Sequence, residues 1–164
     1  MRTIETIKNN IYSKNLIVPF FLIILIFIFD RVTKIKIIEN QINDNKIFIN
    51  DYLNLELVWN TGIAFGLLSI DANIFYHLIS FLIFLICLVI IYMIIKSKFI
   101  DKILFSLILG GALGNFYDRI IYFAVPDFID FHLNQYHWFT FNIADIFITI
   151  GIILLVIKDL ILNK

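Results

Sequence analysis

The sequence contains one cysteine and two prolines among its 164 residues, and only 16% of its residues are charged. A single cysteine, Cys87, cannot form an intrachain disulfide, which excludes a fold held together by disulfides. Because Cys87 lies in the middle of an apolar run, we expect it to pack as a small hydrophobic residue. The 13 basic residues are balanced by 13 acidic ones, so no positive field indicates a nucleic-acid partner.

Hydrophobic residues make up 61% of the chain, and the mean hydropathy is +0.94. Soluble domains are roughly half apolar and richer in charge. The composition therefore predicts an integral membrane protein with one domain over residues 1–164. The first apolar run is too long for a signal peptide and no small-residue cleavage site follows it, so we expect it to stay in the protein.

Four stretches are long enough to cross a bilayer as helices, which takes about 20 apolar residues each. The predicted spans are residues 16–38, 74–95, 103–121 and 143–162. Pro19 would fall in the first turn of the first span, where its missing N–H is tolerated. The predicted fold class is an all-α membrane protein with four transmembrane helices and a small extracytoplasmic β-sheet.

The strand signals lie in the two long polar connections. Residues 53–57 alternate apolar and polar side chains, which predicts a half-buried strand, and residues 59–62 are typical of a turn. Residues 129–134 alternate in the same way and predict a short hairpin that turns near Asn134 and Gln135. We expect these strands to form a small sheet on the membrane surface.

Four spans place both termini on the same side of the membrane. Lysine and arginine are enriched on the cytoplasmic side of membrane proteins. The side of the membrane on which both termini lie carries more lysine and arginine than the other side, so we predict that the termini are cytoplasmic. These residues are Arg2, Lys8, Lys14, Lys96, Lys98, Lys102, Lys158 and Lys164, against Arg31, Lys34, Lys36, Lys46 and Arg119 on the other side.

Four aspartates converge in one layer near the predicted outer face. Asp30 and Asp118 lie about 21 Å and about 23 Å along their spans, at about 1.5 Å per residue. Asp145 lies near the start of the last span, at its predicted outer end. Asp127 lies in the connection before this span. Because charges at membrane depth are costly, these residues are candidates for function.

Asp127 and Asp145 form the best pair for catalysis. Two carboxylates that share a site keep one proton between them. The ionised one can take a proton from water, and the protonated one can donate to the carbonyl under attack. The alternative is that both carboxylates only cap helix ends, since Asp145 near a helix start meets a favourable dipole.

A purely structural role can also explain other residues near this layer. Asp30 and Lys34 are spaced as an ion pair on one helix face. Gly110 and Gly114 form a GxxxG pattern that permits close helix packing. Gly111 shares a further helix face with Asn115 and Asp118.

His132 and His137 lie near Asp127 and Asp130, which raises the question of a metal site. Their spacing matches no strong ligand pattern, and both fall in a predicted strand pair. No serine or cysteine stands beside a histidine in a nucleophile motif. We therefore predict neither a metal nor a cofactor.

Five short blocks occur in order along the chain, and with them it resembles the bacterial lipoprotein signal peptidases, also called signal peptidase II. The resemblance covers nearly the whole chain and the four-span layout. The blocks are Asp30-Arg31-Val32-Thr33-Lys34, Asn60-Thr61-Gly62-Ile63-Ala64-Phe65-Gly66, Gly114-Asn115-Phe116-Tyr117-Asp118-Arg119, Val125-Pro126-Asp127-Phe128 and Phe141-Asn142-Ile143-Ala144-Asp145.

The resemblance implies an aspartic endopeptidase of the bacterial inner membrane, with Asp127 and Asp145 as its catalytic residues near the periplasmic face. The implied substrates are prolipoproteins in the lipid membrane, cut just before a cysteine that carries diacylglycerol, by a monomer without cofactors. The implied substrate-binding residues are Asn60, Gly62, Asn115, Arg119 and Asn142, and the supporting residues are Asp30, Lys34, Gly111, Gly114, Asp118 and Ala144. The chain departs from the family at Pro126, where the usual apolar residue has an N–H.

Two other classes of function fit a small membrane protein. A proton-coupled transporter would use intramembrane Asp, Lys and Arg as a relay. A relay should spread ionisable residues through the membrane depth, whereas here they cluster at one end. A structural membrane subunit would not need so many polar groups in one layer.

Overall fold

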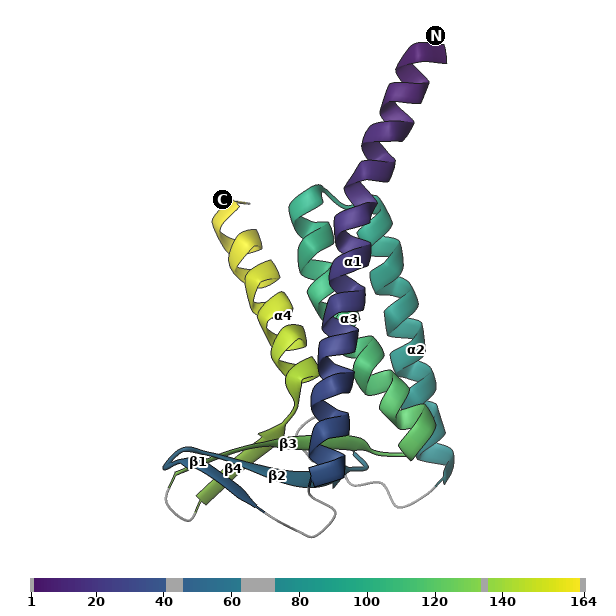
Figure 1. Ribbon diagram of the computed structural model, residues 1–164. Helices are drawn as coiled ribbons and strands as arrows, with labels where there is room; N and C mark the ends of the chain where they lie inside the picture. The colour runs from purple at the N-terminus through teal and green to yellow at the C-terminus, as the bar shows by residue number, and fades with distance from the viewer. Residues whose placement is uncertain (1, 41–45, 63–72, 134–135, 163–164) are drawn as a thin grey trace.

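The computed structural model describes residues 2–40, 46–62, 73–133 and 136–162. Within these ranges the chain forms helices at both ends and in the middle, with strand pairs between them. A four-stranded sheet lies across one end of the helices, and α1 begins and α4 ends at the opposite end (Figure 1). The elements are α1 (Arg2–Asn40), β1 (Ile47–Asn50), β2 (Leu53–Asn60), α2 (Asn73–Lys96), α3 (Phe99–Tyr122), β3 (Val125–Leu133), β4 (Tyr136–Phe141) and α4 (Ile143–Leu162).

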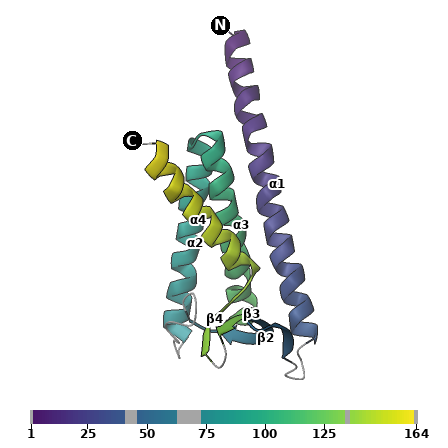
Figure 2. The same cartoon turned by 90° about the vertical axis from the view of Figure 1, so that its left-hand side faces the viewer.

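Helix α1 begins at Arg2, well before the predicted start at residue 16. Pro19 is therefore inside the helix, and the prediction that it lies in the first turn is wrong. No glycine or proline precedes Pro19, so nothing in the polar N-terminal sequence breaks the helix. Figure 2 shows the start of α1 extending beyond the other helices.

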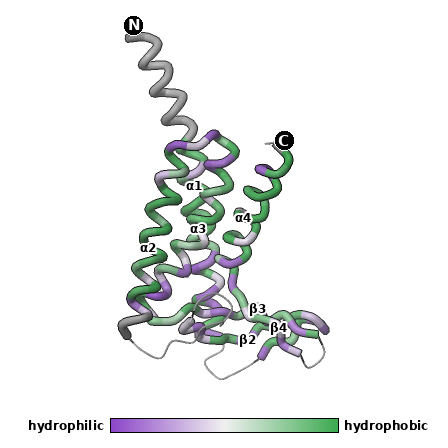
Figure 3. Tube along the Cα trace, turned by 180° about the vertical axis from the view of Figure 1, so that it is seen from behind, coloured by the Kyte–Doolittle hydropathy of each residue, from purple (hydrophilic) through white to green (hydrophobic). Residues whose placement is uncertain are grey.

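Among the described residues, three helical stretches are long and apolar enough to cross a membrane: Leu16–Asn40, Tyr76–Lys96 and Phe99–Tyr122. Helix α4 has 20 residues, with an acidic residue in its first turn and charged residues near its end. Figure 3 shows apolar residues along the helices and polar residues gathered where the helices meet the sheet. The structure thus confirms a mostly helical chain with a small sheet, and a fourth span remains a prediction.

Helix α3 packs against α1, α2 and α4, and small residues allow this close approach. A Cβ added at Gly110 would lie 2.8 Å from Cβ of Ile26 on α1, so the predicted close packing is confirmed. A Cβ at Gly111 would lie 2.4 Å from the carbonyl oxygen of Ala144. Between α2 and α3, Cys87 is buried in a hydrophobic cluster, as expected.

Replacing Gly111 with alanine should push α3 away from the start of α4, because the clashing atom is a backbone oxygen that cannot rotate aside. Overpacking of this kind typically costs about 1–3 kcal/mol of folding free energy. Thermal unfolding of the detergent-solubilised protein measures the loss. Ile120→Ala on the same helix is the control, since Ile120 is 53% exposed; equal stability of both variants would contradict the packing argument.

The sheet is antiparallel throughout, in the order β1-β2-β3-β4. Strand β2 covers the predicted strand but continues through Trp59 and Asn60, which pair with Pro126 and Val125. The turn predicted at residues 59–62 is therefore wrong at its first two positions. The cross-strand partners on β3 outweigh the local turn signal, because strand formation depends on its neighbours.

Strands β3 and β4 form the predicted hairpin, with Leu133 opposite Tyr136. The predicted turn residues Asn134 and Gln135 lie outside the described residues, as does the part of the second block from residue 63 to 66. Pro126 is in β3 beyond the reach of β4, whose pairing ends at Ile129. Proline is tolerated where a strand lacks one neighbour, since its missing N–H is not needed there.

Candidate active site

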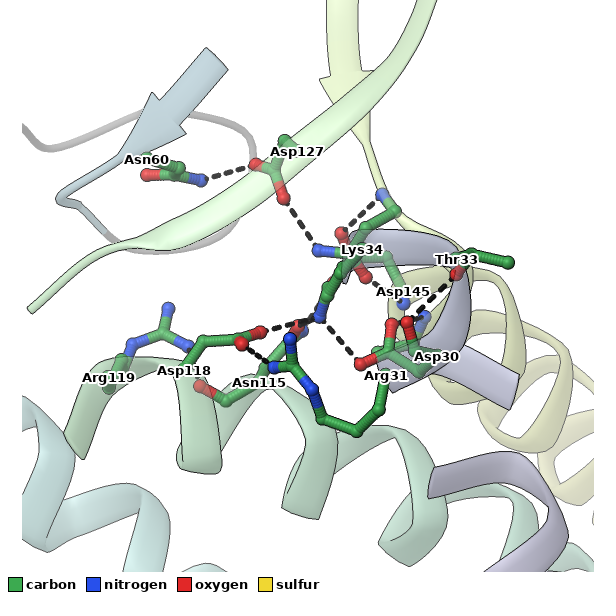
Figure 4. A network of polar contacts seen from close by, with 12 residues as sticks. Asp30, Arg31, Thr33, Lys34, Asn60, Asn115, Asp118, Arg119, Asp127 and Asp145 are labelled. Carbon is green, nitrogen blue, oxygen red and sulfur yellow. Dashed lines mark hydrogen bonds and ion pairs between the residues drawn. The ribbon is translucent and has the colours of Figure 1, made fainter. Parts of the chain in front are cut away.

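Asp127 projects from β3 into a buried polar cluster and is only 3% exposed. Its Oδ2 accepts a hydrogen bond of 2.8 Å from the side-chain amide of Asn60 on β2. Its Oδ1 accepts one of 2.6 Å from the side-chain amide of Asn142, the residue before α4. Both carboxylate oxygens are thereby fixed by neutral donors (Figure 4).

Asp145 lies in the first turn of α4 and is held by the same asparagine. The backbone N–H of Asn142 donates to Oδ2 of Asp145 at 3.1 Å, and the backbone N–H of Asp145 donates to Oδ1 of Asn142 at 3.1 Å. This reciprocal pair is a capping box that satisfies two free donors at the helix start. Asn142 thus caps α4 and also joins the Asp127 and Asp145 carboxylates through its two nitrogens.

The electrostatics of this pair favour a shared proton. Burial, and after it the nearby negative charge of Asp145, raise the pKa of Asp127 to about 6. The hydrogen bonds from Asn60 and Asn142 oppose this rise. Asp127 therefore keeps a proton at a pH where an ordinary aspartate has lost it.

Lys34 is fully buried and lies between two carboxylates. Its Nζ donates to Oδ2 of Asp30 at 2.7 Å and to Oδ2 of Asp118 at 2.7 Å. The predicted ion pair of Asp30 and Lys34 is confirmed. Arg31 adds a second cation, which pairs with Asp118. Its Cζ lies 4.8 Å from the centroid of the Tyr117 ring.

Asn115 links the buried cation to the candidate pair. Its Oδ1 accepts a hydrogen bond of 2.8 Å from Lys34, and its Nδ2 donates to Oδ1 of Asp145 at 2.8 Å. The orientation of Asp145 is therefore set by a chain of contacts that starts in α1. The backbone N–H of Ala144 also donates to Oδ1 of Asp30 at 3.0 Å, which fixes the start of α4 on α1.

Arg119 ties the end of β2 to α3. Its guanidinium donates to the carbonyl of Asn115 at 3.1 Å and to the carbonyl of Gly62 at 3.3 Å. The N–H of Gly62 in turn donates to Oδ1 of Asn60 at 2.9 Å. A Cβ at Gly114 would lie 2.4 Å from Asp30, so this glycine makes room for the carboxylate.

The structure thus joins the predicted polar site residues, together with Gly62 and Ala144, in one hydrogen-bonded network, and Gly111 and Gly114 pack closely against it. Sequence reasoning missed Arg31 as a member, although its place beside Asp30 in an apolar helix was a signal. Asp130 belongs elsewhere, because it contacts Asn54 and His137 and not the network around Asp127. An apolar cavity of about 270 Å³ opens beside Asp145, and it is lined by Phe139, Phe141, Ile146, Thr149 and Ile150.

The sequence profile of signal peptidase II matches residues 22–161. The chain belongs to the signal peptidase II family. It is 50% identical over 161 residues to the lipoprotein signal peptidase of Pelagibacter ubique, covering 95% of each chain. It is 44% identical to that of Francisella tularensis subsp. novicida, covering 88% of this chain and 92% of the relative.

Two solved structures share the fold of this signal peptidase II family member. A bacterial membrane enzyme of 33% sequence identity aligns with a TM-score of 0.74, over 90% of this chain and 92% of that one. A second aligns with a TM-score of 0.72 at 34% identity, over 86% and 91% of the two chains. Together with the apolar helices, the family makes this chain a multi-pass membrane protease.

Proposed function

We propose that this signal peptidase is an aspartic endopeptidase that cuts prolipoproteins just before a diacylglyceryl-modified cysteine. The observation that carries the proposal is the pair of carboxylates from β3 and α4 that Asn142 joins. Two such carboxylates with one proton can activate water without a metal or a nucleophilic side chain.

In the proposed mechanism, Asp145 is the base. It lies at a helix N-terminus and accepts hydrogen bonds from Asn142 and Asn115, which stabilise its ionised form. It takes a proton from the attacking water, while Asp127 donates its proton to the scissile carbonyl oxygen. The roles then reverse: Asp127 takes a proton from a hydroxyl of the tetrahedral intermediate, and the proton on Asp145 passes to the leaving amine as the carbon–nitrogen bond breaks.

The surroundings of the pair suit a lipid-modified peptide. The apolar cavity beside Asp145 offers space for an acyl chain against α4 and β4. Nε of Arg119 is buried without a hydrogen-bond partner among the described residues, so it is a donor for a peptide carbonyl. We assign substrate binding to Arg119 together with Asn60, Gly62, Asn115 and Asn142.

The topology that follows has four spans, with α4 as the fourth. Its 20 residues are long enough to cross a bilayer, which needs about 20. The charge distribution favours cytoplasmic ends for α1 and α4, so the sheet and the carboxylate pair would lie at the outer face of the inner membrane. We also propose a monomeric enzyme, as the family resemblance implies.

The raised pKa of Asp127 predicts how activity depends on pH. Above a pKa of about 6, Asp127 loses the proton that it must donate, so kcat/KM should fall as the pH rises. Between pH 6 and pH 8 the expected loss is about fiftyfold, from the protonated fraction alone. A pH–rate profile on subsaturating substrate checks this, and a kcat/KM that rises steadily to pH 8 would contradict the assignment of Asp127 as the acid.

The proposed function is tested with purified protein in detergent and two forms of one prolipoprotein, with and without the diacylglyceryl group. Cleavage of the lipidated form alone, mapped by mass spectrometry to the bond before the cysteine, is the expected result. Equal cleavage of both forms would contradict the role of the lipid. Cleavage of neither by folded protein would contradict the peptidase itself and direct attention to proton flux in vesicles.

A further inference from the structure

The β3–β4 hairpin carries a cluster of metal-binding side chains that the peptidase mechanism does not use. His132 lies opposite His137 across the hairpin, and their stacked rings have centroids 5.4 Å apart. Nδ1 of His137 lies 2.8 Å from Oδ1 of Asp130, and Nδ1 of His132 lies 3.6 Å from its Oδ2. One ligand atom from each of the three residues can be chosen so that all lie within 4.8 Å of one another.

Asn54 on β2 supplies a second observation at the same place. It pairs with Asp130 in the sheet and is only 4% exposed. Its side-chain amide points at the cluster, 3.2 Å from Nδ1 of His132 and 3.4 Å from Oδ2 of Asp130. Its Oδ1 is buried without a hydrogen-bond partner among the described residues.

The amide of Asn54 fits a cation better when it is reversed. The two ends of an asparagine amide are distinguished by their partners alone. Turned around, Oδ1 of Asn54 faces His132 and Asp130, and a bound cation gives this buried oxygen the partner that it lacks. The cluster then offers two imidazole nitrogens, a carboxylate oxygen and an amide oxygen.

We propose that Asp130, His132 and His137, completed by Asn54, bind a zinc ion. Ligand atoms about 2.0–2.1 Å from a tetrahedral zinc are about 3.3 Å apart. The observed 2.8 Å and 3.6 Å separations lie on either side of this value. Calcium and magnesium prefer oxygen ligands throughout, so the two imidazoles favour zinc and similar transition metals.

The ammonium group of Lys46 would compete with a metal ion for the carboxylate of Asp130. Nζ of Lys46 lies 3.5 Å from Oδ2 of Asp130 and 2.9 Å from Glu56. Its side chain is 40% exposed, so it can leave Asp130 and keep its contact with Glu56. A zinc ion would take the place of this ammonium and join β2, β3 and β4 at Asp130, three residues from Asp127.

The test is a calorimetric titration of the full-length, metal-free protein in detergent with zinc chloride, using a chain without a polyhistidine tag. We expect one zinc per chain. His132→Gln and His137→Gln should each weaken binding by at least about 100-fold, because even the outer partners of metal ligands are worth about 10- to 100-fold. Lys46→Gln should tighten binding by about fivefold or more, because it removes a competing charge.

The matched control is His77→Gln, which changes the third histidine of the chain, an exposed residue on α2 outside the cluster. It should bind zinc as the unchanged protein does. His137 has a half-exposed side chain, so its variant is expected to fold, which circular dichroism checks. Absence of stoichiometric binding, or equal affinity in His137→Gln, would overturn the proposal and leave the histidines as hydrogen-bond partners of Asp130.

Discussion

Asp127→Asn and Asp145→Asn are each expected to reduce cleavage of a diacylglyceryl-modified prolipoprotein by about 10³-fold or more, since positioned acids and bases contribute about 10²- to 10⁴-fold each. Each change removes a proton carrier at nearly constant shape. In Asp145→Asn the remaining oxygen can still accept from the backbone of Asn142, so the helix cap survives. The measurement is kcat at saturating substrate.

Asp130→Asn is the matched control, because Asp130 lies on the same strand but contacts Asn54 and His137 instead. It should retain cleavage. Asp127→Asn places an amide NH₂ near the amide donors of Asn60 and Asn142, so its thermal unfolding must be measured beside its activity. A folded variant at Asp127 or Asp145 that still turns over substrate would show that the pair is wrongly assigned.

Lys34→Ala is expected to cause the largest loss of stability. Lys34 donates to Asp30, Asp118 and Asn115, and its side chain has no exposed surface. Removing it leaves Asp30 without its buried cation and Asp118 with Arg31 alone. Breaking a buried ion pair by removing one partner typically costs about 3–5 kcal/mol. Thermal unfolding in detergent measures this loss.

Lys36→Ala is the control for charge on the same helix, because Lys36 is exposed and should tolerate the change. In Lys34→Ala, activity should fall less than it does in the Asp127 and Asp145 variants, since Asn115 loses one partner but still donates to Asp145. Normal stability with lost cleavage would contradict this account and make Lys34 part of the chemistry.

The elements that local sequence determines were predictable. The apolar runs predicted the cores of the helices, and the alternation of apolar and polar residues predicted the pairing of β3 with β4. The convergence of Asp30 and Asp118 followed from their depths along the helices, and both carboxylates contact Lys34 in the structure.

The features that depend on contacts distant in sequence were not predictable. Asn115 bridges Lys34 and Asp145 only because α3 lies between α1 and α4. The strand that continues through Asn60 depends on its partner β3. Asn54 reaches His132 only because β2 pairs with β3, so the sequence alone does not bring this asparagine to the histidines.

Carbon NMR of the protein labelled at its aspartate carboxyls measures directly whether Asp127 holds a proton because it is buried near the negative charge of Asp145. Asp127→Asn assigns the signal. The titration midpoint of Asp127 is expected near pH 6, and it should move lower in Asp145→Asn because the second negative charge is removed. A midpoint near the ordinary value of 3.8, unchanged in Asp145→Asn, would contradict this expectation.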